Sequence, residues 1–200
     1  AAAKPSPESA MGPPLEKQLE TKEKEFRELR EELEKELQST ALPLLEKAEI
    51  ALDMLEMRDI AELRSMKTPQ EQLKKIMAII AAVVYDVEVK TEADWRAKAG
   101  HSLVPDLKNF NRDEILVEGS EQVKRLEEHC ADEELSIEEM EKFKGPRIAK
   151  CLTTWIWAMR AYAEVRKKIQ PRMDKMRKLE AELIKLYEEK KELEKSKPKA

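Results

Sequence analysis

Glycine, cysteine, histidine and aromatic residues are all scarce in this chain of 200 residues. It contains 4 Gly, 2 Cys and 2 His, and aromatic residues make up 4% of it. Few glycines together with 40% charged residues favour long helices over sheets. Cys130 and Cys151 form no CxxC motif, which argues against a zinc site or a disulfide framework. No apolar run approaches the ~20 residues that a membrane-spanning helix needs, so we expect no membrane partner.

The sequence also lacks a recognisable catalytic centre. His101 and His129 show neither an HExxH motif nor the spacing of metal ligands, and Gly145-Pro146 cannot form a glycine-rich phosphate loop. We therefore expect no enzymatic activity, no cofactor and no metal. The formal net charge of −4 provides no overall basic field, so we expect no nucleic-acid partner either.

What the chain does have is a heptad pattern at each end. The apolar positions alternate by three and four residues, which is typical of a coiled-coil seam. The first arm has them at Leu15, Leu19, Phe26, Leu29, Leu33 and Leu37, and the second at Met176, Leu179, Leu183, Leu186 and Leu193. Charged residues interrupt the seam at Lys22, Glu36, Arg172 and Lys190. The step from Leu33 to Leu37 is a stutter, which locally unwinds a supercoil.

Each arm meets the middle of the chain at a proline, Pro43 or Pro171. A proline inside a helical pattern removes a hydrogen bond and crowds the preceding turn, so we expect both to kink or break their helices and to act as hinges. The predicted fold is all-α: an antiparallel two-helix coiled-coil stalk capped by a small globular helical bundle. We place the stalk helices at residues 15–42 and 171–195 and the bundle at 43–170. Residues 1–14 are expected to be a disordered N-terminal segment or a remnant of cloning, and 196–200 a tail. Because the matched arms lie at opposite ends, pairing within one chain is favoured over a homodimeric rod.

Several helix starts are predicted in the middle segment. Thr68-Pro69-Gln70-Glu71 reads as a capping box, and the helix after it, with Leu73, Ile76, Ile80 and Val83, is the expected core. Ser136 with Glu139 is expected to open the long last helix. Thr91 with Asp94 and Asn111 with Glu114 are weaker starts. Bulky core residues are expected at Trp95, Phe110, Trp155 and Trp157.

Charge is distributed unevenly along the second half. Residues 127–141 contain eight acidic residues and no Lys or Arg, whereas residues 142–168 contain eight basic residues and one acid. Lys142, Lys144, Arg147 and Lys150 gather at an expected helix start, where cations oppose the helix dipole. Two interpretations stay open: these cations pair with neighbouring acidic helices, or they dock onto an acidic partner.

Three segments resemble the stalk and microtubule-binding domain of dynein heavy chains. They are IAELRSMKTP at residues 60–69, LKNFNRDEI at residues 107–115, and Trp155 followed by Met159, Tyr162 and Pro171. The three segments occur in this order, and the resemblance covers about residues 15–195. Their sequences are more similar to those of axonemal (ciliary or flagellar) heavy chains than to that of the cytoplasmic one. The resemblance implies a cytoskeletal, axonemal location.

The resemblance implies that the middle segment binds tubulin while ATP is hydrolysed in a distant ring that this chain does not contain. Affinity would be coupled to that ring by a shift of the coiled-coil register, to which the seam charges and the stutter would contribute. The implied microtubule-binding residues are Arg58, Arg64, Lys67, Lys98, Lys142, Lys144, Arg147 and Lys150. Glu56 and Met57 stand where relatives often carry basic residues. The acidic face 127–141 would point away from tubulin or receive a dynein light chain.

Two other classes of function compete with this one. The chain could be a structural coiled-coil scaffold, or an arm fragment of a chromosome-organising ATPase, without tubulin binding. Hinges of that second kind need strands and many glycines, and zinc-hook arms need CxxC, which this sequence lacks. A helical adaptor with an enzymatic appendage is the third class, for which no site is seen.

Overall fold

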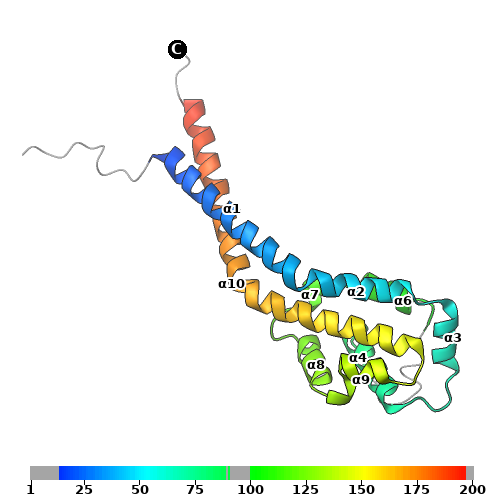
Figure 1. Cartoon of the computed structure of the whole chain (residues 1–200). Helices are drawn as coiled ribbons and strands as arrows, with labels where there is room; N and C mark the ends of the chain where they lie inside the picture. Colours follow the sequence, from blue (N-terminus) through cyan, green and yellow to red (C-terminus); the bar gives the residue numbers. More distant parts are fainter. Residues whose placement is uncertain (1–13, 89, 91–99, 197–200) are drawn as a thin grey trace, which may run out of the picture. The chain divides into compact units, whose positions relative to one another are not determined.

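A computed structural model describes residues 14–88, 90 and 100–196 (Figure 1). Trp95, Lys98 and the predicted helix start at Thr91 lie outside the described residues, as does nearly all of the segment 1–14. The all-α prediction is confirmed: the described residues form helices, and no strand occurs among them. The chain divides into two compact units, which we call the arm unit (residues 1–36 and 169–200) and the body unit (residues 37–168).

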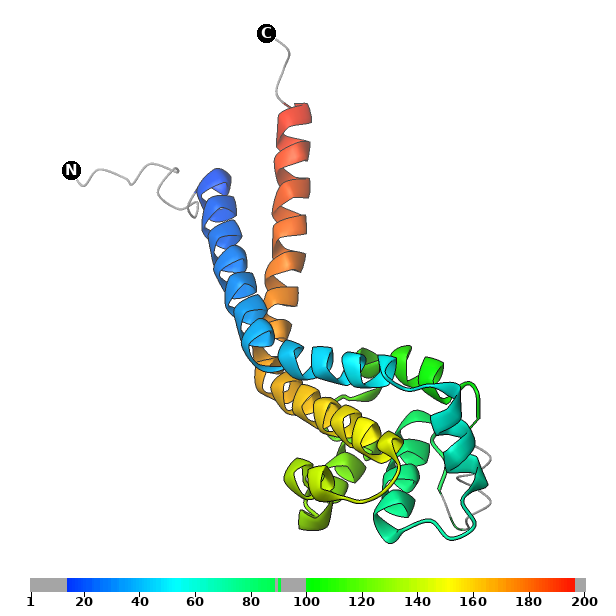
Figure 2. The same cartoon turned by 45° about the vertical axis from the view of Figure 1, so that its right-hand side comes forward.

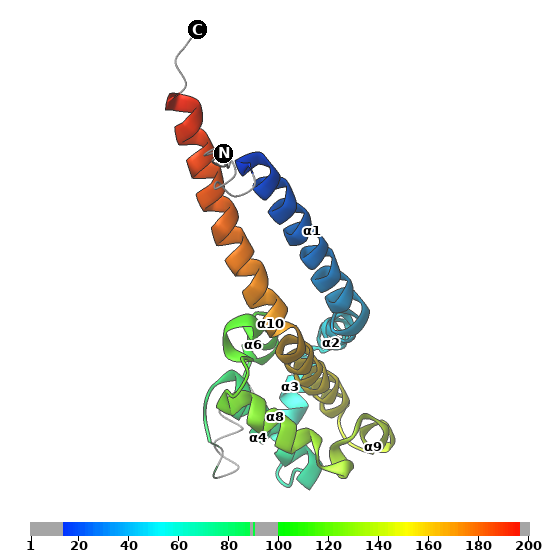
Figure 3. The ribbon, with the colours of Figure 1, turned by 90° about the vertical axis from the view of Figure 1, so that its left-hand side faces the viewer.

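The arm unit is built from α1 (Leu15–Thr40) and the second part of α10 (Arg147–Ser196), which run antiparallel beside each other (Figures 2 and 3). The seam leucines Leu19, Leu29, Leu33, Leu179 and Leu183 are buried, as the heptad pattern predicts. The seam ends before the predicted Leu193, which is 56% exposed. A helix pair of this kind needs its apolar stripe covered, because isolated helices are marginal in water.

The two prolines behave differently from one another. Near Pro43 the expected break is confirmed: α1 ends at Thr40, and α2 (Leu42–Asp53) begins with Pro43 in its first turn. There the missing N–H of proline costs little, because first-turn N–H groups have no partner within the helix. At Pro171 an expected break is wrong, since α10 continues through it. A kink there, and the hinge role of both prolines, stay predictions.

The body unit contains short helices around two long apolar ones (Figure 1). After α2 come α3 (Met57–Ser65), α4 (Glu71–Val84), α6 (Leu103–Lys108), α7 (Arg112–Ile115), α8 (Glu121–Cys130), the 3-10 turn η2 (Glu133–Leu135) and α9 (Ile137–Lys142). The first part of α10 completes the unit. α4 packs against α8, and α2 lies beside the first part of α10 in the views of Figures 1 and 2.

The core lies where the apolar pattern predicts it. α4 buries eight residues, among them Leu73, Ile76 and Ile80, and α10 contributes Ile148, Leu152, Trp155, Ile156 and Met159. The Phe110 and Trp155 rings meet edge to face with centroids 5.4 Å apart, an arrangement that aromatic pairs prefer. Trp157 is only half-buried, and its Nε1–H donates to the Leu135 carbonyl at 3.1 Å. Trp157 therefore fastens η2 to α10 from the edge of the core.

Two predicted helix starts need correction. The capping box at Thr68 is wrong: α4 begins at Glu71, and its N-cap Gln70 makes no side-chain cap bond. Ser136 does cap a helix through Glu139 N at 3.2 Å, but that helix is the short α9, which ends at Lys142. Pro146 lies between α9 and α10, and the residue before a proline avoids the helical conformation. Asn111 precedes α7 as predicted, without a cap bond from its side chain.

Candidate functional site

An ion pair joins α3 to the first residue of α10. Asp59 is only 5% exposed, and Arg147 Nη2 donates to its Oδ2 at 2.6 Å while Arg147 Nε donates to its Oδ1 at 3.3 Å. Arg147 therefore holds the pKa of Asp59 below its ordinary value, against the opposing effect of burial. The cation at the start of α10, which would oppose the helix dipole, is neutralised by this carboxylate.

The same aspartate organises the start of α3. The Glu56 backbone N–H donates to Asp59 Oδ2 at 2.8 Å, and the Glu56 side chain accepts from the Asp59 N–H, which completes a capping box. Sequence reasoning missed this box, because it considered Glu56 only as a departure from relatives and did not consider Asp59. The spacing of Glu56 and Asp59, three residues apart, could have predicted this capping box.

The predicted cations of α3 lie in different surroundings. Arg58 pairs with Glu56 at 2.9 Å, and both side chains are largely exposed. Arg64 is exposed in the last turn of α3, where a positive charge complements the helix dipole. Within the described part of the chain, the Arg64 side chain has no hydrogen bond or ion pair. Lys67 is exposed just after α3.

The cations around the α9–α10 loop are also partly engaged. Lys142 pairs with Glu139 at 2.8 Å, which raises the pKa of the lysine. Lys150 donates to the Glu141 carbonyl at 2.9 Å. The exposed Lys144 side chain, in contrast, has no partner among the residues that the structure describes. Lys142, Arg147 and Lys150 therefore pair internally, as the first interpretation predicts, while docking onto an acidic partner stays a prediction.

The loop that carries Lys144 is tightly packed at Gly145. A Cβ placed on Gly145 would lie 2.0 Å from Phe143 Cε1 and 2.8 Å from Gln70 Oε1. Gln70 Nε2 also donates to the Lys144 carbonyl at 3.4 Å. These contacts fix the loop against the start of α4, and nothing in the sequence beyond the Gly-Pro pair signalled them.

The acidic segment 127–141 spans the end of α8, η2 and α9. Most of its carboxylates are exposed, and Lys75 from α4 binds Asp132 at 2.7 Å and approaches Glu134 at 3.9 Å. Between these elements, burial lowers the pKa of His129 to about 4. Part of the acidic charge is therefore balanced within the body unit, and the remainder faces solvent.

A second set of contacts fixes α7 to α10. The Tyr162 hydroxyl donates to Asp113, and Arg166 donates to the Asp113 carbonyl. The Arg112 guanidinium lies over the Tyr162 ring, 5.3 Å from its centroid, within cation–π range. Burial, together with the hydrogen bond to Asp113, raises the pKa of Tyr162 to about 12.

In the arm unit, the seam charges pair across the two helices. Glu36 pairs with Arg172, and both were predicted to interrupt the seam. Lys22, a third predicted charge, pairs with Glu182, which the sequence pattern did not single out. Lys175 binds Glu25 at 2.6 Å, and the Tyr187 hydroxyl donates to Glu23. A polar group at a seam position specifies register at a cost in stability, so these pairs define one alignment of the helices.

The described residues contain no group of three or more His, Cys, Asp or Glu side chains arranged to hold a metal ion. Within the same residues, no helix is both long and apolar enough to cross a bilayer. The fold defines a class of protein in which a helical body is inserted, along the sequence, between two helical arms.

Comparison with known proteins identifies the family. The family model described as "Microtubule-binding stalk of dynein motor" matches residues 1–199, and the chain belongs to this family. The dynein gamma chain of the flagellar outer arm from Chlamydomonas reinhardtii is 27% identical over 81% of the chain. Dynein axonemal heavy chain 2 of Mus musculus is 27% identical over 72%, and cytoplasmic dynein 2 heavy chain 1 of Caenorhabditis elegans is 25% identical over 76%. The chain spans only 3 to 4% of the length of these relatives.

Proposed function

We propose that the body unit binds tubulin through exposed cations on α3 and around the start of α10. The observation that carries the proposal, besides membership of the family, is the pair Arg64 and Lys144. Each is exposed on one of these elements without an internal partner among the described residues, and the Asp59–Arg147 ion pair joins the two elements. Arg58, Lys67, Lys142, Arg147 and Lys150 belong to the same proposed surface. Lys98 is included from the resemblance alone.

The internal ion pairs of these cations predict how much each contributes to tubulin affinity. A cation already bound to a carboxylate must give up that contact, or share it, before it meets tubulin. We therefore expect Arg64 and Lys144 to contribute most to affinity per residue. Arg147 acts chiefly by holding α3 against α10, so its replacement would disturb the surface as well as remove a charge.

Microtubule co-sedimentation at graded ionic strength tests this function. Exposed charge pairs weaken as salt screens them, so binding should fall steeply as salt rises. The double variant Arg64→Glu/Lys144→Glu should lose at least tenfold in affinity. The matched control Lys124→Glu/Lys167→Glu makes the same charge change on exposed lysines of α8 and α10. If the unmodified chain stays in the supernatant at low salt, or if control and variant weaken binding equally, the proposal fails.

We further propose that affinity is coupled to the register of the arm helices. A shift of four residues, about 6 Å at 1.5 Å per residue, would exchange the partners of Lys22, Glu25 and Glu36. These pairs favour the register described here, but they lower the stability of the seam, so a modest change in free energy could populate a second register. In the whole heavy chain, this equilibrium would link tubulin binding to a distant ATPase.

Covalent locking separates the registers. With Cys130→Ser and Cys151→Ala as background, Glu25→Cys/Lys175→Cys places thiols at two positions whose native side chains meet across the arms, and a bifunctional thiol crosslinker would lock the register described here. A crosslinker is used because a disulfide needs a shorter Cβ–Cβ distance than a pair of long side chains guarantees. Moving the second cysteine by four residues along the arm would lock the alternative. The two locked forms should differ in microtubule affinity by tenfold or more. Equal affinities would refute coupling through register while leaving tubulin binding itself intact.

Two further points of the proposal rest on resemblance. Because relatives named as flagellar and axonemal dyneins match the chain, we propose an axonemal, cytoskeletal location. We also propose that the exposed acids of segment 127–141 receive a light chain. Charge reversal of Glu133 and Glu138, which are exposed and make no ion pair with a described residue, should then abolish co-purification of a light chain without weakening microtubule binding.

A further inference from the structure

Exposed apolar side chains are distributed unevenly over the body unit. In the part of this unit that the structure describes, three large apolar side chains are more than half exposed: Ile50 at 61%, Met54 at 53% and Met57 at 58%. The other exposed ones keep 37 to 40% of their surface, and they are Leu42, Val117 and Ile137. Single exposed apolar side chains are ordinary on a protein surface, whereas a group of them marks a site of interaction.

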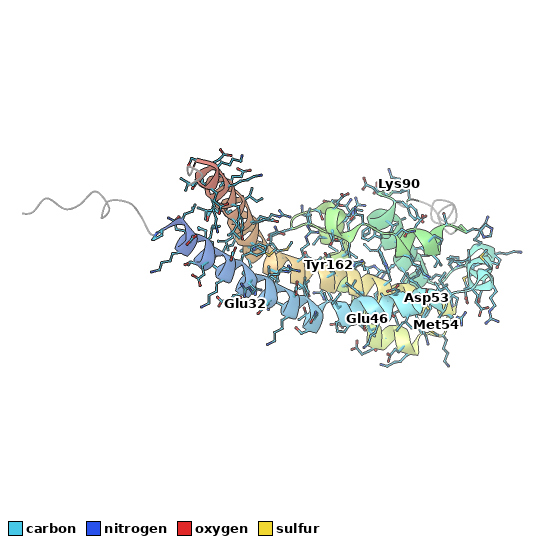
Figure 4. The ribbon with its side chains drawn as sticks, turned by 90° about the horizontal axis from the view of Figure 1, so that it is seen from above. Glu32, Glu46, Asp53, Met54, Lys90 and Tyr162 are labelled. Carbon is cyan, nitrogen blue, oxygen red and sulfur yellow. The ribbon has the colours of Figure 1, made fainter. Side chains whose placement is uncertain are left out.

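The three most exposed side chains lie where α2 passes into α3. Ile50 and Met54 are one helical turn apart, since the Met54 backbone N–H donates to the Ile50 carbonyl at 3.1 Å, and residues four apart are neighbours on a helix surface. Met57 is the first residue of α3, so its Cα lies at most about 11 Å from that of Met54. Figure 4 shows Met54 next to Asp53, where α2 ends. We call Ile50, Met54 and Met57 the apolar corner.

Ion pairs neutralise the acids that flank the two methionines of this corner. Asp53, just before the first methionine, pairs with Lys108, and Glu56, just before the second, pairs with Arg58 at 2.9 Å. Each acid therefore carries its own cation. The surface around the methionines is apolar and locally neutral, so an acidic partner would meet little net repulsion there.

Negative charge remains at the other end of the corner. Glu46 and Glu49 precede Ile50 on α2, are exposed, and form no ion pair with any described residue. Lys47, which is also exposed, offsets one of these two charges. An acidic partner is therefore expected to approach the methionines more closely than Ile50.

We propose that Met54 and Met57 pack against tubulin, with Ile50 at the margin of the contact, and that they provide a part of the affinity that salt does not screen. This inference rests on the proposed function, because it extends the surface of the α3 cations to the first residue of α3 and the end of α2. Burial of apolar surface is driven by its removal from water, whereas salt screens the attraction between exposed charges. Methionine suits such a contact because its flexible side chain adapts to irregular surfaces.

Microtubule co-sedimentation of Met54→Gln/Met57→Gln over a series of salt concentrations tests the contact. Glutamine is uncharged and unbranched and favours helices about as well as methionine, so the fold should be kept, which circular dichroism checks. The dissociation constant should rise at least fivefold, by the same factor at each salt concentration. The loss in Arg64→Glu/Lys144→Glu should instead be largest at low salt and shrink as salt rises.

A matched control and a crosslinker locate the effect. Leu42→Gln/Val117→Gln replaces two other exposed apolar side chains of the body unit and should bind microtubules as tightly as the unmodified chain. The photoreactive residue p-benzoylphenylalanine should form crosslinks to tubulin when it stands in place of Met54, and none when it stands in place of Val117.

Four results would overturn the contact: unchanged affinity of the methionine variant, a loss confined to low salt, an equal loss in the control, or crosslinks only between two copies of the chain. With any of them the proposed function stands, provided that Arg64→Glu/Lys144→Glu still weakens binding. Failure of the unmodified chain to bind microtubules would instead refute the proposed function, and the apolar contact with it.

Discussion

The arm unit and the body unit are both helical, yet different forces stabilise them. In the described residues, the arm unit buries six apolar side chains: Leu19, Leu29, Leu33, Ile169, Leu179 and Leu183. The body unit buries several times as many around α4 and the first part of α10. Charge pairs across the arm helices supplement a thin seam, whereas in the body the pair between the buried Asp59 carboxylate and Arg147 supplements a closed core. The body should thus resist salt and small changes that alter the arms.

Truncation of the core should have the largest effect and would sharpen this contrast. Ile80→Ala removes a fully buried side chain of α4 and should lower the free energy of unfolding by about 2–5 kcal/mol. Leu183→Ala in the arm unit, where the side chain is 9% exposed, should cost below about 2 kcal/mol. Urea denaturation followed by tryptophan fluorescence measures the first, and helical circular dichroism measures the second. Equal losses would contradict the proposed difference between the units.

Loss of the buried ion pair should be the next largest effect. Asp59→Asn leaves Arg147 without its carboxylate and weakens the start of α3, so we expect about 2–3 kcal/mol of destabilisation near neutral pH. Because the pKa of Asp59 is lowered in the fold, its contribution is present above the ordinary carboxylate pKa and disappears as pH falls through the folded value. Chemical denaturation of wild type and variant should therefore converge in acid. A constant difference at all pH values would assign the loss to packing instead.

Acidification should weaken the body through His129. Its pKa falls from the ordinary 6.5 to about 4 in the fold, so the unfolded chain binds a proton that the folded chain excludes. The stabilising contribution is complete above pH 6.5 and is lost between 6.5 and about 4, to an extent of up to about 3 kcal/mol. Chemical denaturation at several pH values across this range should show a weaker dependence of the free energy of unfolding on pH in His129→Gln than in the wild type. An unchanged slope in that variant would exclude the histidine as the cause.

A methyl group at Gly145 should have an intermediate effect. The Phe143 ring or Gln70 must move to admit it, and such overpacking costs about 1–3 kcal/mol. Because the shift falls on the loop that carries Lys144, microtubule affinity should fall as well, by more than in an equally destabilised core variant. Co-sedimentation with Gly145→Ala and a matched core variant makes this comparison.

The smallest effect is expected in the arm unit, from exchanging its charges. The swap Lys22→Glu/Glu182→Lys keeps the pair with reversed sign, and exposed pairs contribute below about 1 kcal/mol. Each single variant should lower helical stability slightly, and the swap should restore it. A double-mutant cycle at low and high salt measures the coupling, with the Lys24–Glu28 pair within α1 as control. A coupling energy that stays the same at high salt would contradict this prediction, because it would show that solvent ions do not screen the Lys22–Glu182 pair.

Features that depend on periodicity could be predicted from the sequence. The seam leucines of the arms, the apolar face of α4 and the break near Pro43 follow from local patterns. Pro171 could not be judged locally, because an uninterrupted helix depends on what packs on either side of the missing hydrogen bond. Among the candidate site residues, the sequence located the cations but not their partners. The pairing of Asp59 with Arg147, 88 residues apart, exists only once α3 and α10 have packed.

The distance along the chain between paired arm residues has a consequence for biosynthesis. Lys22 and Glu182 are separated by 160 residues, while the body unit is a contiguous stretch of sequence. At about 5–20 residues per second, the ribosome delivers the second arm roughly 10–30 s after the first. During that interval the body unit can fold alone, but the leucine stripe of α1 stays uncovered because the second arm has not yet been synthesised. We expect the many charged residues of α1 to limit association of this uncovered segment with neighbouring nascent chains.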